Sequence, residues 1–129
     1  MGEKHPHVLI IEDNALVARS LRLVLRAHSP ILVDSLATLR GTLPTVPEGL
    51  VVLSDLGLGD GGADEVLALL SAERPDLLQR LFWMSGGGIM LDRYQDTIDK
   101  SGRPLVLKPV APLQLRGLVE GALAEADAD

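Results

Sequence analysis

Five polar residues stand just after short apolar runs in this sequence, and they carry the kinds of side chain that phosphoryl transfer requires. They are Glu12, Asp13, Asp55, Ser85 and Lys108. Three carboxylates held close together repel one another, so they ionise together only when a cation offsets their charge. Ligand sets made of oxygen alone select a hard cation such as Mg²⁺. A lysine adds a point charge for a phosphoryl oxygen, a serine adds a hydrogen-bond donor, and one carboxylate can then act as nucleophile.

The apolar runs that precede these residues predict strands. Each run is apolar throughout, which is typical of a parallel strand covered by helices on both faces. The predicted strands are Val8–Ile11, Ile31–Val33, Leu50–Leu53, Leu81–Met84 and Leu105–Leu107. Helical patterns fill the segments between and after them, at residues 14–28, 35–40, 63–74, 91–100 and 113–124.

This alternation of five strands and five helices predicts an α/β fold with a doubly wound parallel sheet, because crossovers between parallel strands are right-handed. In an open sheet of this kind, ligands bind beyond the carboxyl ends of the strands. The five polar residues all follow strands, so we expect them to meet at that edge. The sequence therefore predicts a metal-dependent phosphoryl-transfer site there.

Length and composition exclude several other classes of protein. A chain of 129 residues favours a single domain, residues 1–129. Its 18 acidic and 12 basic residues give a net charge of −6, which argues against a nucleic-acid surface. The absence of cysteine excludes a disulfide framework and a thiol nucleophile. No signal peptide and no apolar run of membrane-spanning length is visible, so we expect a cytoplasmic protein without membrane contact.

The sequence resembles the receiver domains of two-component response regulators over residues 7–124. Four short segments carry this resemblance, and their order and spacing at strand ends make it specific. They are Ile11-Glu12-Asp13-Asn14, Leu53-Ser54-Asp55-Leu56-Gly57-Leu58, Met84-Ser85-Gly86 and Leu107-Lys108-Pro109. A longer segment, residues 101–109, is similar to receivers attached to hybrid histidine kinases. The resemblance implies a flavodoxin-like (βα)5 three-layer sandwich with strand order 2-1-3-4-5.

The resemblance also implies a function, which is to accept a phosphoryl group on Asp55 within a two-component phosphorelay. The donor would be a phosphohistidine of a histidine kinase or of a histidine phosphotransfer domain. Lys108 would pair with the phosphoryl group, and Ser85 would be the hydroxyl that moves onto it. No separate turnover enzyme is expected, because the domain catalyses only its own Mg²⁺-dependent phosphorylation and dephosphorylation.

The metal site implied by the resemblance uses four residues. Asp13 and Asp55 would bind Mg²⁺ directly, with the backbone carbonyl of Gly57 as a third protein ligand. Glu12 would hold the metal through water. The bond between Lys108 and Pro109 is expected to be cis.

Two departures from the family pattern concern the surroundings of the acceptor. Gly57 and Gly87 occupy two positions at which family side chains influence how water reaches the phosphoryl group, so we expect the site to be uncovered on that side. Leu105 stands where many receivers carry a Tyr or Phe that rotates inward when the hydroxyl moves. We therefore predict that output uses a surface other than the one built around the strand of Leu105.

Two other functions remain open. One is a pseudo-receiver that binds partners and is never phosphorylated. The other is a phosphatase with an aspartyl-phosphate intermediate, although that family typically needs Asp-x-Asp and here Gly57 stands at the second position. Residues 57–62 also match the dinucleotide fingerprint G-x-G-x-x-G, but Asp55 and Asp60 would repel a pyrophosphate, so we reject dinucleotide binding.

The first predicted helix has a second apolar face, formed by Leu16, Leu23 and Ala27, beside three arginines. A helix that is apolar on two sides is either deeply buried or a contact surface. The face would pack against the last helix, or it would dock a helix bundle of the kinase or phosphotransfer partner. The three histidines, at positions 5, 7 and 28, do not suggest a metal site from their spacing, and we interpret them as structural or surface residues.

Overall fold

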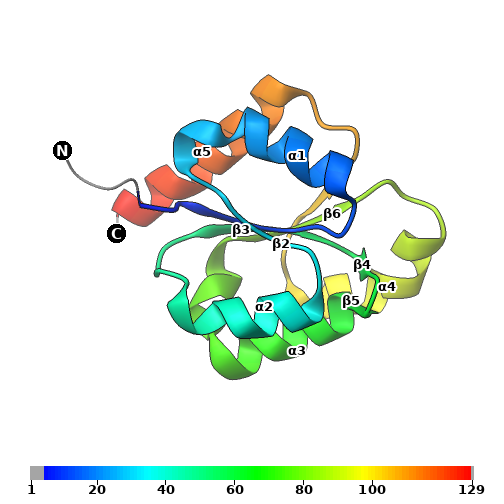
Figure 1. The fold of residues 1–129 in the computed structure, drawn as a ribbon. Coiled ribbons are helices and arrows are strands. Elements are labelled where there is room, and N and C mark those ends of the chain that lie inside the picture. The colour runs from blue at the N-terminus through cyan, green and yellow to red at the C-terminus, as the bar shows by residue number, and fades with distance from the viewer. Residues whose placement is uncertain (1–4, 129) are drawn as a thin grey trace.

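The computed structural model describes residues 5–128 and contains a parallel sheet with helices on both faces (Figure 1). The strands of this sheet are β1 (Val8–Ile11), β2 (Ile31–Val33), β3 (Val51–Asp55), β6 (Leu81–Ser85) and β7 (Leu105–Leu107). Their order across the sheet is β2-β1-β3-β6-β7, and each neighbouring pair is parallel. Counting these five strands alone, the order is 2-1-3-4-5, so the expected flavodoxin-like fold is confirmed.

The helices form the two outer layers. Helices α1 (Ala15–Val24) and α5 (Pro112–Ala128) cover one face of the sheet, as Figure 1 shows. The other face carries α2 (Leu36–Thr42), α3 (Ala63–Glu73) and α4 (Ile89–Ser101). Short 3-10 turns follow three of these helices, η1 (Arg26–His28), η2 (Leu43–Thr45) and η3 (Pro75–Arg80). Within residues 5–128, no helix combines the length and the apolar character needed to cross a membrane.

The first helix is shorter than its apolar pattern predicts. The α-helical turns end at Val24, and the chain tightens into η1 before it reverses at Ser29. Ser29 has a φ of 49°, a left-handed conformation that redirects the chain toward β2. The pattern predicts helix as far as residue 28, because the same hydrophobic spacing continues through the 3-10 turn.

Two apolar clusters form the core, one on each face of the sheet. Successive strand residues point to opposite faces, so Val8 and Ile10 pack with α1 and α5, whereas Leu9 and Ile11 pack under α2 and α3. Trp83 is fully buried in the cluster under α2 and α3. Its Nε1 donates to Ser101 Oγ at 2.9 Å, which ties β6 to the end of α4.

The glycine-rich segment after Asp55 contains a small antiparallel pair that the sequence did not predict. It consists of β4 (Gly57–Leu58) and β5 (Gly61–Gly62). Between these strands, the Asp60 carboxylate accepts from the backbone N–H groups of Leu36 and Ala37, at 2.8 and 3.1 Å. The N–H of Leu36 is the main reason that the pKa of Asp60 lies below its usual value. This segment therefore caps α2, which agrees with the rejection of a dinucleotide loop.

Candidate functional site

The carboxyl edge of the sheet brings together the three acids that the sequence singles out. One carboxylate oxygen each from Glu12, Asp13 and Asp55 lies within 4.8 Å of the other two. Glu12 is buried, with 3% of its surface exposed, whereas Asp13 is exposed and Asp55 is intermediate. The cluster thus runs from the protein interior to the surface, and solvent reaches it from the Asp13 side.

The sheet register explains why these acids meet. Ile11 of β1 lies opposite Ser54 of β3, so Glu12 and Asp55, each one residue further on, end neighbouring strands at the same level. Asn14 caps α1, because its Oδ1 accepts from the N–H groups of Leu16 and Val17 at 3.0 and 3.1 Å. Since Asn14 does the capping, the acids before it serve the cluster instead.

Lys108 joins the cluster from β7. Its Nζ donates to Glu12 Oε1 at 2.8 Å and lies 3.4 Å from Asp55 Oδ1. Burial lowers the pKa of Lys108, but the hydrogen bond to Glu12 and the charges of Asp55 and Glu12 outweigh this effect and raise the pKa above its ordinary value. Lys108 is therefore a firmly charged cation beside Asp55. The peptide bond between Lys108 and Pro109 is cis, as expected.

Ser85 ends β6, the strand that lies between those of Asp55 and Lys108. It is buried, with 2% of its surface exposed, and its carbonyl oxygen accepts from the Lys108 N–H at 2.7 Å. Its Oγ accepts from the Gly87 N–H at 2.9 Å. Because Oγ is the acceptor in that bond, its proton remains available for another oxygen.

The side of the site next to Gly57 is covered, contrary to the prediction from its glycines. A Cβ placed on Gly57 would lie 2.8 Å from Cε and 3.0 Å from Sδ of Met90. The Met90 side chain, from the first turn of α4, therefore occupies the space beside Gly57. At Gly57 the prediction was wrong, because it considered only the residues near Asp55 and Ser85 in sequence. At Gly87, by contrast, nothing lies within 4 Å of an added Cβ.

The acidic cluster fits a magnesium ion. It offers oxygen donors only, and Asp13 and Asp55 reach the surface, where water can complete an octahedral shell. Glu12 is engaged by Lys108 through Oε1 and by the Asn14 N–H through Oε2, at 2.8 and 3.2 Å. Glu12 is therefore better suited to hold a metal-bound water than to bind the ion directly. The role of the Gly57 carbonyl stays a prediction.

Leu105 is partly buried and packs against the same apolar cluster as Trp83, its partner across the β6–β7 pair. The large aromatic side chain at this place is therefore Trp83 of β6, fixed to α4 through Ser101, and not a residue of β7. The prediction about the output surface remains a prediction.

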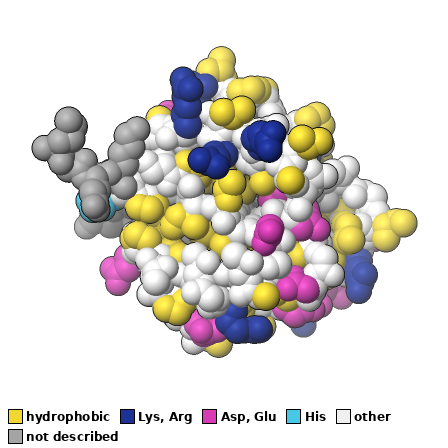
Figure 2. Space-filling model, in the orientation of Figure 1, with side chains coloured by type: hydrophobic (Ala, Val, Ile, Leu, Met, Phe, Trp, Pro, Cys, Tyr) yellow, Lys and Arg dark blue, Asp and Glu magenta, His cyan; other side chains and the backbone are white. Residues whose placement is uncertain are grey.

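The apolar face of α1 is open to solvent. Leu16 and Leu23 have 72% and 62% of their surface exposed, so they do not pack against α5. A groove of about 330 Å³ lies beside Leu16 and reaches Pro109 and Lys108. Figure 2 shows hydrophobic and basic side chains next to one another over the α1–α5 side of the molecule. The alternative that this face packs against α5 is therefore wrong for Leu16 and Leu23, and the docking of a partner on it stays a prediction.

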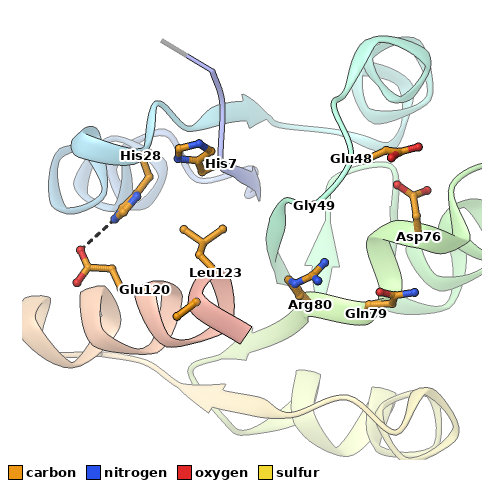
Figure 3. Close-up of a pocket in the computed structure, with 10 residues that line it drawn as sticks. His7, His28, Glu48, Gly49, Asp76, Gln79, Arg80, Glu120 and Leu123 are labelled. Atoms are coloured by element: carbon orange, nitrogen blue, oxygen red, sulfur yellow. Dashed lines mark hydrogen bonds and ion pairs between the residues drawn. The ribbon is translucent and has the colours of Figure 1, made fainter. Parts of the chain in front are cut away.

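His7 and His28 lie near the amino ends of β1 and β2, at the edge of the sheet opposite to the acidic cluster. The rings of His7 and His28 are 6.1 Å apart, and His28 Nε2 lies 3.1 Å from Glu120 Oε2 of α5. They line a hollow of about 790 Å³. Arg80 lies across from them, as Figure 3 shows. Sequence spacing did not reveal that His7 and His28 are neighbours. Their contacts link β1, η1 and α5, which is a structural role.

Comparisons with known proteins support the fold and leave the function to be argued from the site. No family model matches the chain, and no curated protein sequence matches it. Among solved structures, a CheY-like response regulator receiver domain protein from Methanospirillum hungatei JF-1 is similar with a TM-score of 0.76 at 16% identity, covering 96% of this chain and 98% of that one. A two-component response regulator from Clostridium difficile has a TM-score of 0.74 at 18% identity, covering 93% and 97%. The signal receiver domain of an HD domain-containing protein from Pseudomonas fluorescens Pf-5 has a TM-score of 0.79 at 15% identity, covering 99% and 93%. The chain thus has the fold of receiver domains.

Proposed function

We propose that this chain is a single receiver domain that accepts a phosphoryl group on Asp55, with Mg²⁺, from a phosphohistidine. The observation that carries the proposal is the convergence of three carboxylates within 4.8 Å with Lys108 3.4 Å from Asp55, at the carboxyl edge of a receiver fold. A metal-binding acid cluster alone would not need the lysine, and a structural ion pair alone would not need a third acid.

The reaction transfers one phosphoryl group between two side chains. An Asp55 carboxylate oxygen attacks phosphorus, a new P–O bond forms, and the P–N bond to the donor imidazole breaks. The imidazole leaves with the bonding electron pair and takes up a proton. Charge on the transferred group is spread over its equatorial oxygens, so catalysis consists of positioning and charge stabilisation.

Each residue of the cluster has a part in that stabilisation. Asp13 and Asp55 would hold Mg²⁺, with Glu12 acting through water. The ion, when bound, neutralises charge on the phosphoryl oxygens. Lys108 lies close enough to Asp55 to donate to another of those oxygens. The Ser85 hydroxyl, which ends the neighbouring strand, would turn from Gly87 toward the phosphoryl group, which adds about −1.5 to −2 charge and three acceptors.

The donor would dock on the exposed face of α1. The groove beside Leu16 ends at Lys108, so a helix lying in it would bring a phosphohistidine to the mouth of the site. Arg19 and Arg22 of α1 and Arg26 of η1 are exposed and favour an acidic partner surface. This geometry supports a histidine kinase or a histidine phosphotransfer domain as the partner.

The test is mass spectrometry of the intact protein after incubation with acetyl phosphate and Mg²⁺. A phosphoryl adduct should form on the wild-type chain, disappear in Asp55→Asn, and fail to form when EDTA replaces Mg²⁺. Asp96→Asn, which changes an exposed acid on α4, should label normally. A wild-type chain that takes up no phosphoryl group would support the pseudo-receiver instead, and continuous release of phosphate from a phosphomonoester would support the phosphatase.

A further inference from the structure

The side chain of Met90 lies against the loop that follows Asp55, and the proposed transfer reaction does not use it. Its methyl carbon and sulfur are the atoms nearest to the place where a Cβ on Gly57 would stand. Gly57 is two residues beyond Asp55 and belongs to the segment expected to provide the carbonyl ligand. Met90 therefore touches the acceptor loop itself.

The backbone explains how a helix residue reaches this loop. β6 runs beside β3, with Met84 opposite Asp55, so the segment after Ser85 leaves the sheet next to the acceptor. Gly87 and Gly88 have φ values of 89° and 69°, which only glycine adopts without strain. The chain bends at these two glycines, and the first turn of α4 therefore lies over Gly57. Ile89, the preceding residue, has 84% of its surface exposed, whereas Met90 has 44%.

We propose that Met90 is an apolar cover which limits the access of water to the phosphorylated Asp55, and that it replaces the side chain that position 57 lacks. This inference rests on the proposed function. In hydrolysis, a water oxygen attacks phosphorus, the P–O bond to Asp55 breaks, the carboxylate leaves with the electron pair, and the water proton passes to the phosphate. A thioether and a methyl group cannot donate a hydrogen bond to that water, and they fill space that it would need.

The space is filled by a side chain that can move. Methionine is unbranched, with three rotatable bonds, and only its far end meets Gly57. Water and the donor imidazole both approach phosphorus in line with the Asp55 oxygen, but a docked donor can displace the mobile end of Met90, whereas a single water molecule cannot. Met90 therefore slows hydrolysis more than it hinders phosphorylation.

The main test compares the decay of phosphorylated protein after removal of the donor, in the presence of Mg²⁺. Met90→Ala should lose its phosphoryl group about three times faster than wild type or more, while its initial rate of labelling stays unchanged. Met90→Leu, which keeps an apolar side chain of similar volume, should decay within about twofold of wild type. Ile89→Ala is the matched control, because it truncates the neighbouring exposed residue, and it should decay like wild type.

A second measurement observes the contact directly. The chain has three methionines, so protein labelled with ¹³C at the methionine methyl gives at most three such signals, and Met90→Leu identifies the one from Met90. Gly57→Ala should shift that signal, because its new methyl group would lie 2.8 Å from Met90 Cε and 3.0 Å from Sδ and would displace them. Phosphorylation should shift it as well, and Asp55→Asn should abolish only the shift on phosphorylation.

The outcomes distinguish the proposed role of Met90 from the proposed phosphoacceptor function on which it rests. A wild-type chain that never accepts a phosphoryl group refutes the proposed function and, with it, the cover. A chain that is labelled on Asp55 and decays equally fast with and without Met90 refutes the cover alone. Equal acceleration by Ile89→Ala and Met90→Ala also refutes it, because the effect would then belong to the helix end and not to the contact with Gly57.

Discussion

Replacing Asp13 by asparagine should stabilise the metal-free protein. Three carboxylates share a space less than 4.8 Å across, and among the described residues only Lys108 forms ion pairs with them, to Glu12 and Asp55. Asp13 therefore adds negative charge that its neighbours repel. Asparagine keeps the shape of the side chain and removes the charge.

The size of the effect follows from Coulomb's law. Two unit charges 4.8 Å apart repel by about 0.9 kcal/mol in water and by about 3.5 kcal/mol at an effective dielectric constant of about 20. Asp13 is exposed, so the water value applies, and two partners give about 2 kcal/mol. The positive charge of Lys108, which pairs with Glu12 and Asp55, offsets part of this, which leaves a net gain of about 1 kcal/mol. In a domain of this size that gain raises Tm by about 3–5 °C.

The assay is thermal and urea unfolding at pH 7 in EDTA and low salt. Asp13→Asn should be the more stable protein under these conditions, and added NaCl should narrow the difference, because salt screens exposed charges. Added Mg²⁺ should make wild type more stable than Asp13→Asn. At a concentration of about 100 times its Kd, a ligand stabilises the protein that binds it by about 2.7 kcal/mol, and the variant lacks a ligand for the ion.

A matched control removes one charge elsewhere. Glu125→Gln changes an exposed acid near the end of α5, and it should shift stability by about 0.5 kcal/mol or less with no response to Mg²⁺. The reasoning fails if Asp13→Asn is no more stable than wild type in EDTA, or if Mg²⁺ stabilises both proteins equally. Either result would mean that the three acids are not a repelling cluster that a cation relieves.

Four further predictions concern other parts of the molecule. The pKa of Lys108 is raised in the folded protein, which contributes stability below the unfolded pKa of about 10.4. This stability is lost as pH rises through the folded pKa of Lys108. The difference in unfolding free energy between wild type and Lys108→Met, measured in urea, should therefore shrink from pH 8 to pH 11. Arg74→Lys should cost about 2 kcal/mol in the same assay, because Arg74 Nη1 donates to two carbonyl oxygens of the segment after α2, at 2.7 and 2.6 Å, while Nε and Nη2 donate to the Asp76 carboxylate at 3.0 and 2.8 Å. One lysine ammonium cannot reproduce both sets of bonds. Leu16→Ser with Leu23→Ser should slow transfer from the partner's phosphohistidine and spare labelling by acetyl phosphate, whereas equal loss of both would indicate a folding defect. Amide NMR of the free and phosphorylated forms should show its large shifts outside β7, and shifts concentrated around Leu105 would contradict the prediction of another output surface.

The places of the strands along the chain and the positions of the site residues could be predicted from the sequence for a simple physical reason, whereas the order of the strands across the sheet followed from the family resemblance. Strands buried on both faces must be apolar throughout, so the runs from Val8 and from Leu81 stand out from their surroundings. A polar residue directly after such a run must lie at the carboxyl edge of the sheet. Parallel strands all end there, so Glu12, Asp55 and Lys108 are predicted to meet without any knowledge of their contacts.

Other features depend on which surfaces pack together, and local sequence carries no signal of that. The apolar pattern of α1 shows two faces, but only the packed structure shows that Leu16 and Leu23 remain exposed. Asp60 reads as part of a glycine-rich fingerprint, and only the tertiary structure brings it to the N–H groups that begin α2.

The sequence by itself thus determined the chemistry of the site, because residue type and position at a strand end are local properties. The tertiary structure alone decided what surrounds it. Gly57 predicts an open side, and Met90 covers that side from a helix on another part of the chain. Such a contact is decided by the path of the backbone through Gly87 and Gly88 and by the packing of α4, which depend on the whole fold.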